Sequence, residues 1–333
     1  MKKKLFAMIL AGLMTLSLAA CGGSQSDGGG DSAPADSGDG QSYVVGVCQL
    51  APHPALDAAT QGFIDALKEA LGDQVEIKTQ NAGGEVPNCT TIIDGFVAEN
   101  VDLILANATP ALTAAASATS EIPILGTAVT NYGVALDLDT TEDKVLGGNI
   151  AGTSDLAPLD QQAAMLQELF PDAKNVGLLY CSAEANSMFQ VETIQGYLEG
   201  MGYTCTQYAF TDVNDLSSVA QNAADNSDVI YIPTDNTAAN NAETIANVVI
   251  PAKVPVVAGE EGICKGCGCV TLSIDYYELG QITGQQAVEI LTGAKSVSET
   301  AIGFDTTLEK KFNAANCEAL GITVPEDYVA IEG

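Results

Sequence analysis

Cysteines offer the most obvious chemistry in this sequence, and three of them stand within six residues. Cys264, Cys267 and Cys269 form the run Cys-Lys-Gly-Cys-Gly-Cys. Two cysteines separated by two residues can chelate a metal ion or cycle between thiols and a disulfide. A loop entering a strand, either reduced or pinned by a disulfide, has the same spacing. Because no histidine and no second cysteine pair stands nearby, we favour the structural interpretation and expect no bound metal or cofactor.

Polar side chains with binding chemistry gather in short runs, each of which follows a run of apolar residues. The candidate ligand contacts are Gln49, His53, Thr109, Thr127, Ser154, Asn186, Ser187, Asp235, Asn236, Glu260 and Asp275. Any one of them could instead cap a helix, a role that suits Asn186, Asp235 and Asn236 by residue type. Their repeated position after apolar runs favours a shared binding site.

Those apolar runs are predicted strands that alternate with amphipathic helices. The predicted strands are 43–48, 75–79, 102–106, 123–126, 175–180, 203–210, 228–232, 254–258 and 270–274. The predicted helices are 55–71, 88–99, 109–119, 158–170, 186–200, 215–225, 237–249 and 276–291. Continuous apolar strands between such helices indicate parallel sheets covered on both faces. Two successive sets predict an α/β protein of two doubly wound domains, with ligands bound at the carboxyl ends of the strands.

The N-terminus looks like an export signal. Lys2, Lys3 and Lys4 precede an apolar run that is too short to span a membrane, and Leu18-Ala19-Ala20-Cys21 follows it. This ending resembles the lipobox of bacterial lipoproteins, in which the cysteine is acylated. We therefore expect residues 1–20 to be a signal peptide, Cys21 to be lipidated and residues 21–42 to be a disordered tether. An ordinary secretory signal cleaved near Ala20 is the alternative.

Composition narrows the classes of partner. The chain has 43 acidic residues against 12 lysines and no arginine, for a net charge of −31. Such a charge repels nucleic acid and anionic lipid. Because the chain has no arginine, a bound carboxylate must rely on hydroxyls, backbone amides, helix N-termini or a lysine. The single histidine argues against a Ser–His–Asp hydrolase and a His-rich zinc site. The eight cysteines after Cys21 permit disulfides, whose pairing the sequence does not reveal.

Seven stretches occur in the order found in one family of receptors. They are His53–Asp57, Ala108–Ala111, Gly126–Thr130, Glu184–Ser187, Pro233–Asn236, Gly259–Glu261 and Ile274–Gly280. Together they resemble the substrate-binding lipoproteins of ABC transporters, in the group of tryptophan and aromatic amino-acid receptors, across residues 43–330. The resemblance implies a type I periplasmic-binding-protein fold whose two lobes are joined by three crossings. It places 43–155 with 273–298 in lobe 1, and 156–272 with 299–333 in lobe 2.

The implied function is capture of a small zwitterion, for delivery to a membrane permease, by a monomeric, non-enzymatic receptor that closes about a hinge. We expect Asp235 to bind the ligand's ammonium, with Glu260 or Asp275 as second choices. We assign Thr109, Thr127, Ser154 and Ser187 to its carboxylate. Asn186, Asn236 and Gln49 would orient the ligand. His53 would either stack on the ligand's ring or form hydrogen bonds only within its own loop.

Three other interpretations remain open. A sugar or nucleoside receptor could share the fold, although such sites usually contain stacking aromatics and the chain has no tryptophan. An exported metal or redox protein could work through Cys264, Cys267 and Cys269. A sensor that binds the same ligand without delivering it has no distinguishing sequence feature.

Overall fold

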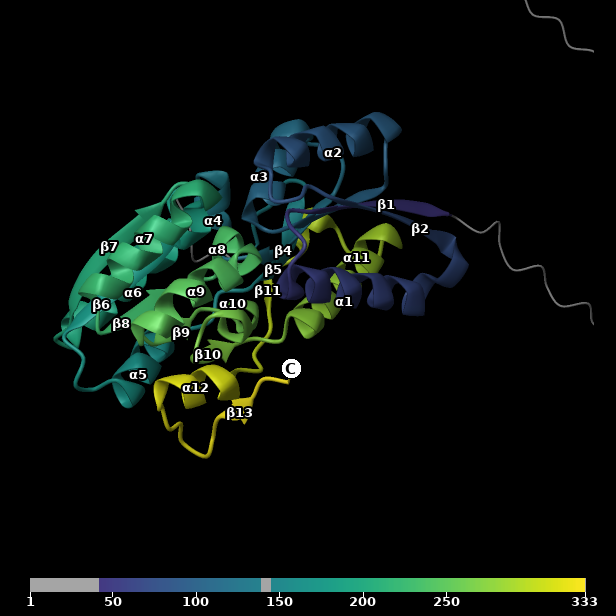
Figure 1. Cartoon of the computed structure of the whole chain (residues 1–333). Coiled ribbons are helices and arrows are strands. Elements are labelled where there is room, and N and C mark those ends of the chain that lie inside the picture. The colour runs from purple at the N-terminus through teal and green to yellow at the C-terminus, as the bar shows by residue number, and fades with distance from the viewer. Residues whose placement is uncertain (1–41, 139–144, 333) are drawn as a thin grey trace, which may run out of the picture. The chain divides into compact units, whose positions relative to one another are not determined.

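The computed structural model describes residues 42–138 and 145–332 (Figure 1). The predicted signal peptide, Cys21 and nearly all of the tether lie outside the described residues. Within them the structure has two sheets in one compact unit of the chain, built largely from parallel strands, which confirms the predicted fold class. No helix in the described ranges is long and apolar enough to cross a membrane.

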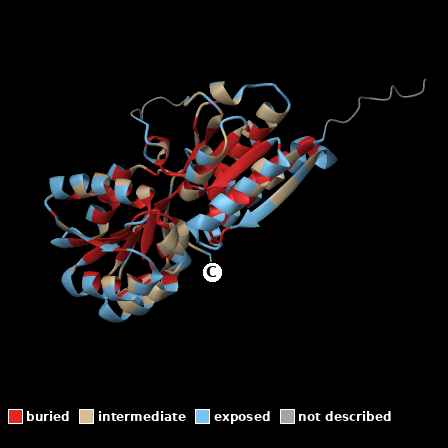
Figure 2. Ribbon diagram, turned by 90° about the horizontal axis from the view of Figure 1, so that it is seen from above, coloured by how far each residue is buried: buried red, intermediate tan, exposed pale blue. Residues whose placement is uncertain are grey.

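The first sheet is wholly parallel, with the strand order β11-β5-β4-β3-β1-β2. Its strands are β1 (Tyr43–Gln49), β2 (Val75–Asn81), β3 (Leu103–Asn107), β4 (Ile124–Val129), β5 (Ile150–Ser154) and β11 (Gly303–Phe304). The central strands are apolar on both faces because helices cover both: Val47 and Leu105 face one layer, Cys48 and Ala106 the other. Figure 2 shows these strands as a buried band beneath helices whose outer faces are exposed.

Two helix layers enclose this sheet. The helices are α1 (Pro54–Leu71), α2 (Val86–Glu99), α3 (Thr109–Ala118), α4 (Tyr132–Leu136) and α11 (Tyr276–Leu291), with short 3-10 turns at Gly72–Gln74 and Val297–Glu299. α2, α3 and α4 pack on one face, while Phe63 and Leu67 of α1 and Ala287 of α11 pack on the other. We call this sheet and its helices the first lobe.

α1 and α11 lie unusually close together, although more than 200 residues separate them in the chain. A Cβ atom at Gly62 would collide with the carbonyl oxygen of Tyr277. One at Gly280 would collide with the carbonyl oxygen of Ala59. Glycine at both positions therefore allows the two backbones to meet, and it fixes α1 against α11.

The second sheet has the order β13-β12-β10-β9-β8-β6-β7. Its strands are β6 (Asn175–Cys181), β7 (Thr204–Phe210), β8 (Val229–Ile232), β9 (Val256–Ala258), β10 (Val270–Ser273), β12 (Glu309–Phe312) and β13 (Val329–Ala330). Its helices are α5 (Leu159–Leu169), α6 (Ala185–Gly200), α7 (Val213–Asn226), α8 (Asn236–Asn240), α9 (Ala242–Ala252), α10 (Glu261–Gly266) and α12 (Ala314–Leu320). β12 runs antiparallel to β10, and the other pairings are parallel. We call this the second lobe.

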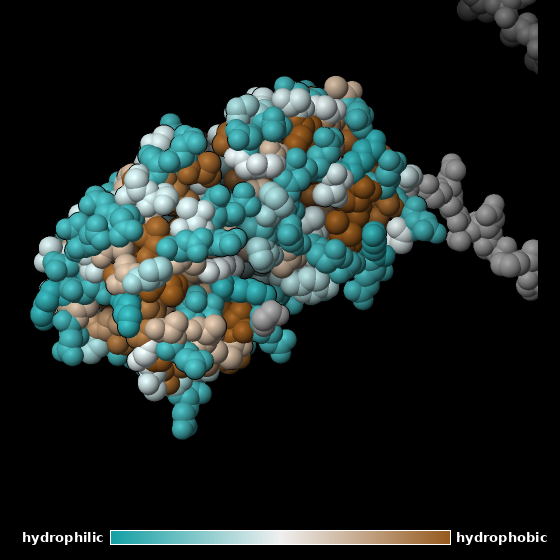
Figure 3. All heavy atoms as spheres, viewed as in Figure 1, coloured by the Kyte–Doolittle hydropathy of each residue, from teal (hydrophilic) through white to brown (hydrophobic). Residues whose placement is uncertain are grey.

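The chain passes between the two sheets after β5, after β10 and after β11. The last passage lies later than expected from the sequence. β11 pairs in parallel with β5 of the first sheet, whereas the expected bound for that lobe was residue 298. Figure 3 shows that the viewed face of the molecule is mainly hydrophilic, with apolar residues in small separated patches.

Three local predictions need correction. The helix expected over 237–249 is two helices, α8 and α9, with a break at Asn241. The helix expected to begin at residue 88 begins at Val86, behind Glu85 as its N-cap. The cysteine cluster was expected in a loop, but Cys264 lies in α10 and Cys267 caps the end of that helix.

The cysteine cluster is also divided by the second sheet. Cys264 and Cys267 pack in the core on one face of this sheet, and Cys269 packs in the core on the other. Among the described residues, no three or more His, Cys, Asp or Glu side chains are grouped so as to hold a metal ion. The interpretation of this cluster as a metal site therefore gains no support from the arrangement of its side chains.

Candidate functional site

A small cavity lies between the carboxyl ends of the two sheets, where parallel α/β folds bind ligands. Both lobes line it, and the volume left between them is about 10 Å³, roughly the space that one water molecule needs. The first lobe contributes His53, Ala55, Leu56, Ala128, Thr130, Asp155 and Tyr276. The second contributes Asn186, Thr234, Asp235, Asn236, Ala239 and Glu260. Three of these residues are acids and none is a lysine, so the cavity favours a cationic group.

Hydrogen bonds between the lobes close this cavity on several sides. The hydroxyls of Thr130 and Thr234 are 3.4 Å apart, and Gln190 Nε2 donates to both, at 3.4 Å to Thr130 and 2.5 Å to Thr234. His53 Nε2 lies 3.4 Å from Asn236 Oδ1. The two lobes therefore already touch across the site, as they would around a bound ligand.

Asp235, the acid first assigned to the ligand's ammonium, is occupied by the fold. Its Oδ1 accepts the backbone N–H of Ala238 at 2.8 Å and so caps α8. Its Oδ2 accepts the N–H of Cys181 at 2.7 Å, which ties the end of β6 to α8. Burial and the nearby Glu184 raise the pKa of Asp235 to about 7. Because both of its carboxylate oxygens already accept backbone N–H groups, Asp235 acts mainly to hold the end of β6 against the start of α8.

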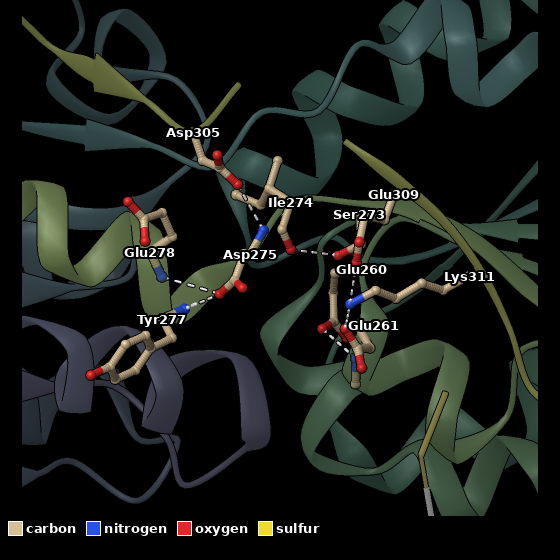
Figure 4. Close-up of polar contacts among 11 residues, drawn as sticks. Glu260, Glu261, Ser273, Ile274, Asp275, Tyr277, Glu278, Asp305, Glu309 and Lys311 are labelled. Atoms are coloured by element: carbon tan, nitrogen blue, oxygen red, sulfur yellow. Dashed lines mark hydrogen bonds and ion pairs between the residues drawn. The ribbon is translucent and has the colours of Figure 1, made fainter. Parts of the chain in front are cut away.

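The two second-choice acids also cap helices (Figure 4). Glu260 accepts the N–H groups of Gly262 and Ile263 at the start of α10, and burial raises its pKa to about 7. Asp275 accepts those of Tyr277 and Glu278 at the start of α11, at 2.9 and 3.1 Å. Glu260 lines the cavity, whereas Asp275 lies in a neighbouring hollow with Lys265 and Lys311.

Glu184, just outside the cavity lining, completes this pattern in the second lobe. One carboxylate oxygen accepts from the Asn236 backbone at 3.0 Å and from the Asn236 side chain at 2.7 Å. The other accepts from the Thr237 backbone at 2.8 Å and hydroxyl at 2.7 Å. The carboxylates of Asp235, Glu260 and Glu184 in the second lobe thus already accept hydrogen bonds from backbone amides and neighbouring side chains.

Asp155 of the first lobe is different, and sequence reasoning did not select it. It directly follows β5, is buried, and accepts the Tyr276 hydroxyl at 3.1 Å through Oδ2. Its Oδ1 is buried with no hydrogen-bond partner. Burial raises the pKa of Asp155 to about 6, against the opposing effect of the Thr130 and Tyr276 hydroxyls. A buried carboxylate oxygen without a partner in a cavity can accept a hydrogen bond from a ligand.

The N-terminus of α1 opens into the same cavity. His53 occupies its N-cap position without a side-chain cap, and Pro54 follows as the first helical residue. The first hydrogen bond of the helix runs from the Asp57 N–H to the His53 carbonyl at 3.0 Å, so the amides of Ala55 and Leu56 precede the intrahelical ladder. His53 Nδ1 is buried and unpartnered, and burial lowers the pKa of this histidine, which favours the neutral ring.

The remaining candidate residues lie beneath or beside the cavity rather than on its wall. Gln49 bridges Ala51, Asp57 and Thr60 under α1. The Thr127 hydroxyl bonds those of Thr153 and Thr283. Ser154 donates to the Thr130 carbonyl at 2.9 Å, and Ser187 hydrogen-bonds Asp235. Thr109 lines a separate hollow beside α2 and α3. Asn186 does line the cavity, and its Oδ1 is unpartnered.

Backbone strain marks the same edge of the first sheet. Ala108 and Ala128, after β3 and within the end of β4, have φ values of 88° and 51°. Few residues other than glycine adopt such angles. The pairing register between β4 and β5 shifts at this point, between Gly126 and Val129. Non-glycine residues with unfavourable backbone angles concentrate at functional sites, and Ala128 lines the cavity.

Comparison with known proteins gives the family. A model of ABC transporter substrate-binding proteins matches residues 44–331. A curated relative, the tyrosine-binding protein of Clostridioides difficile, is 34% identical over 312 residues, which cover 92% of this chain and 88% of the relative. Substrate-binding proteins of ABC importers act outside the cytoplasm.

Two solved structures of similar proteins differ in ligand state, and this chain matches them to different degrees. An ABC domain from Streptococcus pneumoniae in complex with L-Trp is 33% identical and has a TM-score of 0.81, with 86% of this chain and 96% of that chain covered. A ligand-free, open substrate-binding protein with adhesive properties from Clostridium difficile is also 33% identical. Its TM-score is 0.67, with 87% of this chain and 99% of that chain covered. At equal identity, this structure is closer to the ligand-bound relative, in agreement with its touching lobes.

The fold, the cavity at the sheet ends and these matches agree: the chain belongs to the family of ABC transporter substrate-binding proteins.

Proposed function

We propose that this protein captures an aromatic amino acid in the cavity between its lobes and delivers it to a membrane permease, without catalysing a reaction. The observation on which this rests is the unpartnered Oδ1 of Asp155 in a buried cavity that has three acids and no lysine among its lining residues. The relatives support the ligand class, because one is a tyrosine-binding protein and another was solved with L-Trp.

The ligand's ammonium group is assigned to Asp155 in place of Asp235. Asp155 has a free acceptor and already holds the Tyr276 hydroxyl, which positions the carboxylate. Glu260 adds negative charge from the second lobe, near enough for Asp155 to raise its pKa. A bound cation compensates the cost of two buried acids that otherwise repel each other. A bound cation therefore favours the closed arrangement of the lobes over the open one.

The ligand's carboxylate is assigned to the N-terminus of α1. The amides of Ala55 and Leu56 stand ahead of the helix's first hydrogen bond, and the positive end of an 18-residue helix favours an anion. The unpartnered Nδ1 of the neutral His53 ring and the unpartnered Oδ1 of Asn186 also line the cavity, but both are acceptors and suit the ligand's ammonium rather than its carboxylate. The N-terminus of α1 thus replaces the arginine that the chain lacks.

The cavity offers an apolar wall to a ring, but it must open to admit one. Its volume in this structure is about 10 Å³, far below the ~300–1,000 Å³ of ligand pockets, so the lobes must move apart to admit an amino acid. Leu56, Ala128, Ala239 and the ring of Tyr276 provide the apolar surface. Of the other residues selected from the sequence, Asn236, Asp235, Gln49, Thr127, Ser154 and Ser187 are assigned to support the wall, and Asp275 to cap α11.

Delivery requires opening and anchoring. We assign residues 43–155 with 273–304 to one lobe and 156–272 with 305–333 to the other, and the three passages between the sheets to a hinge. Cys21 is assigned as the lipidated residue that holds a monomer at the membrane. Labelling with a radioactive fatty acid tests the anchor, since Cys21→Ala should abolish incorporation.

The decisive experiment uses the fact that the chain has no tryptophan. Indole fluorescence from purified protein, released on denaturation, would come from bound tryptophan. L-Trp, L-Tyr and L-Phe are then added to ligand-stripped protein, and at least one should raise the Tm and release heat in calorimetry. If none does, while the protein remains folded, the aromatic amino-acid assignment is wrong, and sugars and nucleosides are the next ligands to screen.

Matched analogues separate the two halves of the site. Indole-3-propionate keeps the ring and carboxylate of tryptophan but lacks the ammonium, and tryptamine keeps the ring and ammonium but lacks the carboxylate. Indole-3-propionate should bind far more weakly than L-Trp because it offers no donor to Asp155. Tryptamine should retain more affinity than indole-3-propionate, since every ionisable group lining the cavity other than His53 and Tyr276 is an acid.

A further inference from the structure

Four of the eight cysteines after Cys21 form two close pairs, although all eight are thiols in this structure. Cys48 of β1 and Cys89 of α2 are both fully buried in the same core cluster, and they lie close enough for each thiol to shift the pKa of the other. Cys269, directly before β10, and Cys317 of α12 make the second pair in another core cluster. Cys317 Sγ donates to the Cys269 carbonyl oxygen at 3.4 Å, and each of these two thiols shifts the pKa of the other.

Backbone contacts hold each pair in place. In the first pair, the residues next to both cysteines are linked through Ala82: its N–H donates to the Gln49 carbonyl at 2.8 Å, and Asn88 Nδ2 donates to its carbonyl at 3.0 Å. In the second pair, the Asn313 N–H donates to the Cys269 carbonyl at 2.8 Å. The Cys317 N–H in turn donates to the Asn313 carbonyl at 2.9 Å. The thiols are neighbours because fixed backbone segments meet, and not because flexible side chains drift together.

The other cysteines are not placed in this way. Cys181 and Cys205 are on adjacent strands, but Cys205 is opposite Val176 and Cys181 is opposite Phe210, which separates them along the sheet. Cys264 and Cys267 are at the two ends of one helical turn of α10, and the structure gives no hydrogen bond between their thiols.

We propose that the exported protein contains two disulfide bonds, Cys48–Cys89 and Cys269–Cys317. In each reaction two S–H bonds break, one S–S bond forms, and two electrons and two protons pass to a disulfide oxidant. That oxidant is the disulfide of an exported thiol oxidoreductase or oxidised glutathione, which is itself reduced to two thiols. Proteins that work outside the cytoplasm meet conditions in which such bonds persist.

Both bonds lie within a lobe and neither joins the two lobes. The first fixes α2 to the end of β1, immediately before the Gln49–His53 segment that leads to the cavity. The second fixes α12 to the start of β10, on the face of the second sheet away from Cys264 and Cys267. Each closes a loop of some forty residues or more and restricts the unfolded chain, while hinge motion between the lobes remains free.

Peptide mapping tests the pairing directly. The full-length protein, exported by its host or incubated with oxidised glutathione, is denatured, alkylated without reduction, digested and analysed by mass spectrometry. The expected result is two cross-linked peptides, Cys48 with Cys89 and Cys269 with Cys317, with alkyl groups on Cys181, Cys205, Cys264 and Cys267. Alkylation of all four paired cysteines, or a different pair such as Cys264–Cys317, would overturn the proposal.

Thermal unfolding provides the second test. Reducing agent should lower the Tm of the oxidised protein by roughly 5–15 °C. The double variant Cys48→Ala/Cys89→Ala should lose part of this sensitivity, and the control Cys205→Ala should keep all of it. An equal Tm with and without reducing agent would contradict the proposal. Ligand affinity should be the same in both redox states, so failure here and failure of the ligand assignment are distinguishable.

Discussion

The acids that the two lobes contribute to one cavity differ in their hydrogen bonds. Asp235 and Glu260 of the second lobe have both carboxylate oxygens bonded to backbone amides. Asp155 and His53 of the first lobe each have a buried polar atom without a partner. Among the cavity acids, those of the second lobe therefore have both oxygens bonded, while Asp155 of the first lobe has an acceptor that a ligand can complete; Asn186 of the second lobe also has an unpartnered amide oxygen. Burial and negative charge alone do not distinguish these roles, because all three acids are buried and have raised pKa values.

Exchange of one carboxylate for an amide in each lobe should separate the roles most strongly. Asp155→Asn removes the partner of the ligand's ammonium, and we expect a loss of about 2–4 kcal/mol in binding, or roughly 30- to 700-fold in Kd. The Tm of the empty protein should not fall, since no backbone amide loses its acceptor. Calorimetry and thermal unfolding of the same samples check this. Unchanged affinity would show that Asp155 does not bind the ligand.

Asp235→Ala should have the reverse pattern. It leaves the N–H groups of Cys181 and Ala238 without their acceptor, and we expect the empty protein to lose about 2–3 kcal/mol of unfolding free energy. For a chain of this size that is a fall in Tm of roughly 4–12 °C. If instead stability is kept and only affinity is lost, the division of roles between the lobes is wrong.

Ligand affinity should rise with pH as the cavity acids ionise. Burial raises the pKa of Asp155 to about 6 and that of Glu260 to about 7, so the folded empty protein keeps protons that the unfolded chain has lost. Between about pH 4 and 7 the empty protein therefore becomes less stable as pH rises. A bound ammonium favours the ionised acids, so binding should strengthen across the upper part of this range and release protons. Calorimetry in buffers of different ionisation enthalpy measures that release, and Asp155→Asn should reduce it.

The smallest predicted effect concerns the strained backbone of the first lobe. Ala108→Gly replaces a residue at φ 88° with one that adopts this angle freely, and should stabilise the empty protein by up to about 1 kcal/mol. Lys253→Gly is a useful control in the second lobe, because Lys253 has φ 57° at an ordinary helix end. Denaturant unfolding of both variants measures the difference. A destabilised Ala108→Gly protein would show that the strain is absent.

The sequence predicted the central strands and long helices to within a few residues, because continuous apolar runs and amphipathic stripes leave little ambiguity. It missed β5, whose Gly-Thr-Ser ending lacks that apolar signal, and therefore missed Asp155 directly after it. It also could not separate a helix cap from a ligand contact, because both need an oxygen acceptor at a strand end. Asp235 is followed by α8 and serves as a cap, whereas Asp155 is followed by three non-helical residues before α5. That difference is the signal which points to Asp155, and it requires the helix boundaries.

The close contact between α1 and α11 has a consequence for the order in which the protein matures. The first lobe needs α11 and β11, which are synthesised only after most of the second lobe. A growing chain that ends at β10 has every strand of the second sheet except β12 and β13, yet Gly62 of α1 still lacks the backbone of Tyr277 against which it packs. Neither lobe is complete until the last sixty residues are present. Such a chain stays only partly folded during its synthesis, which is the state in which a protein bound for the far side of a membrane has to travel.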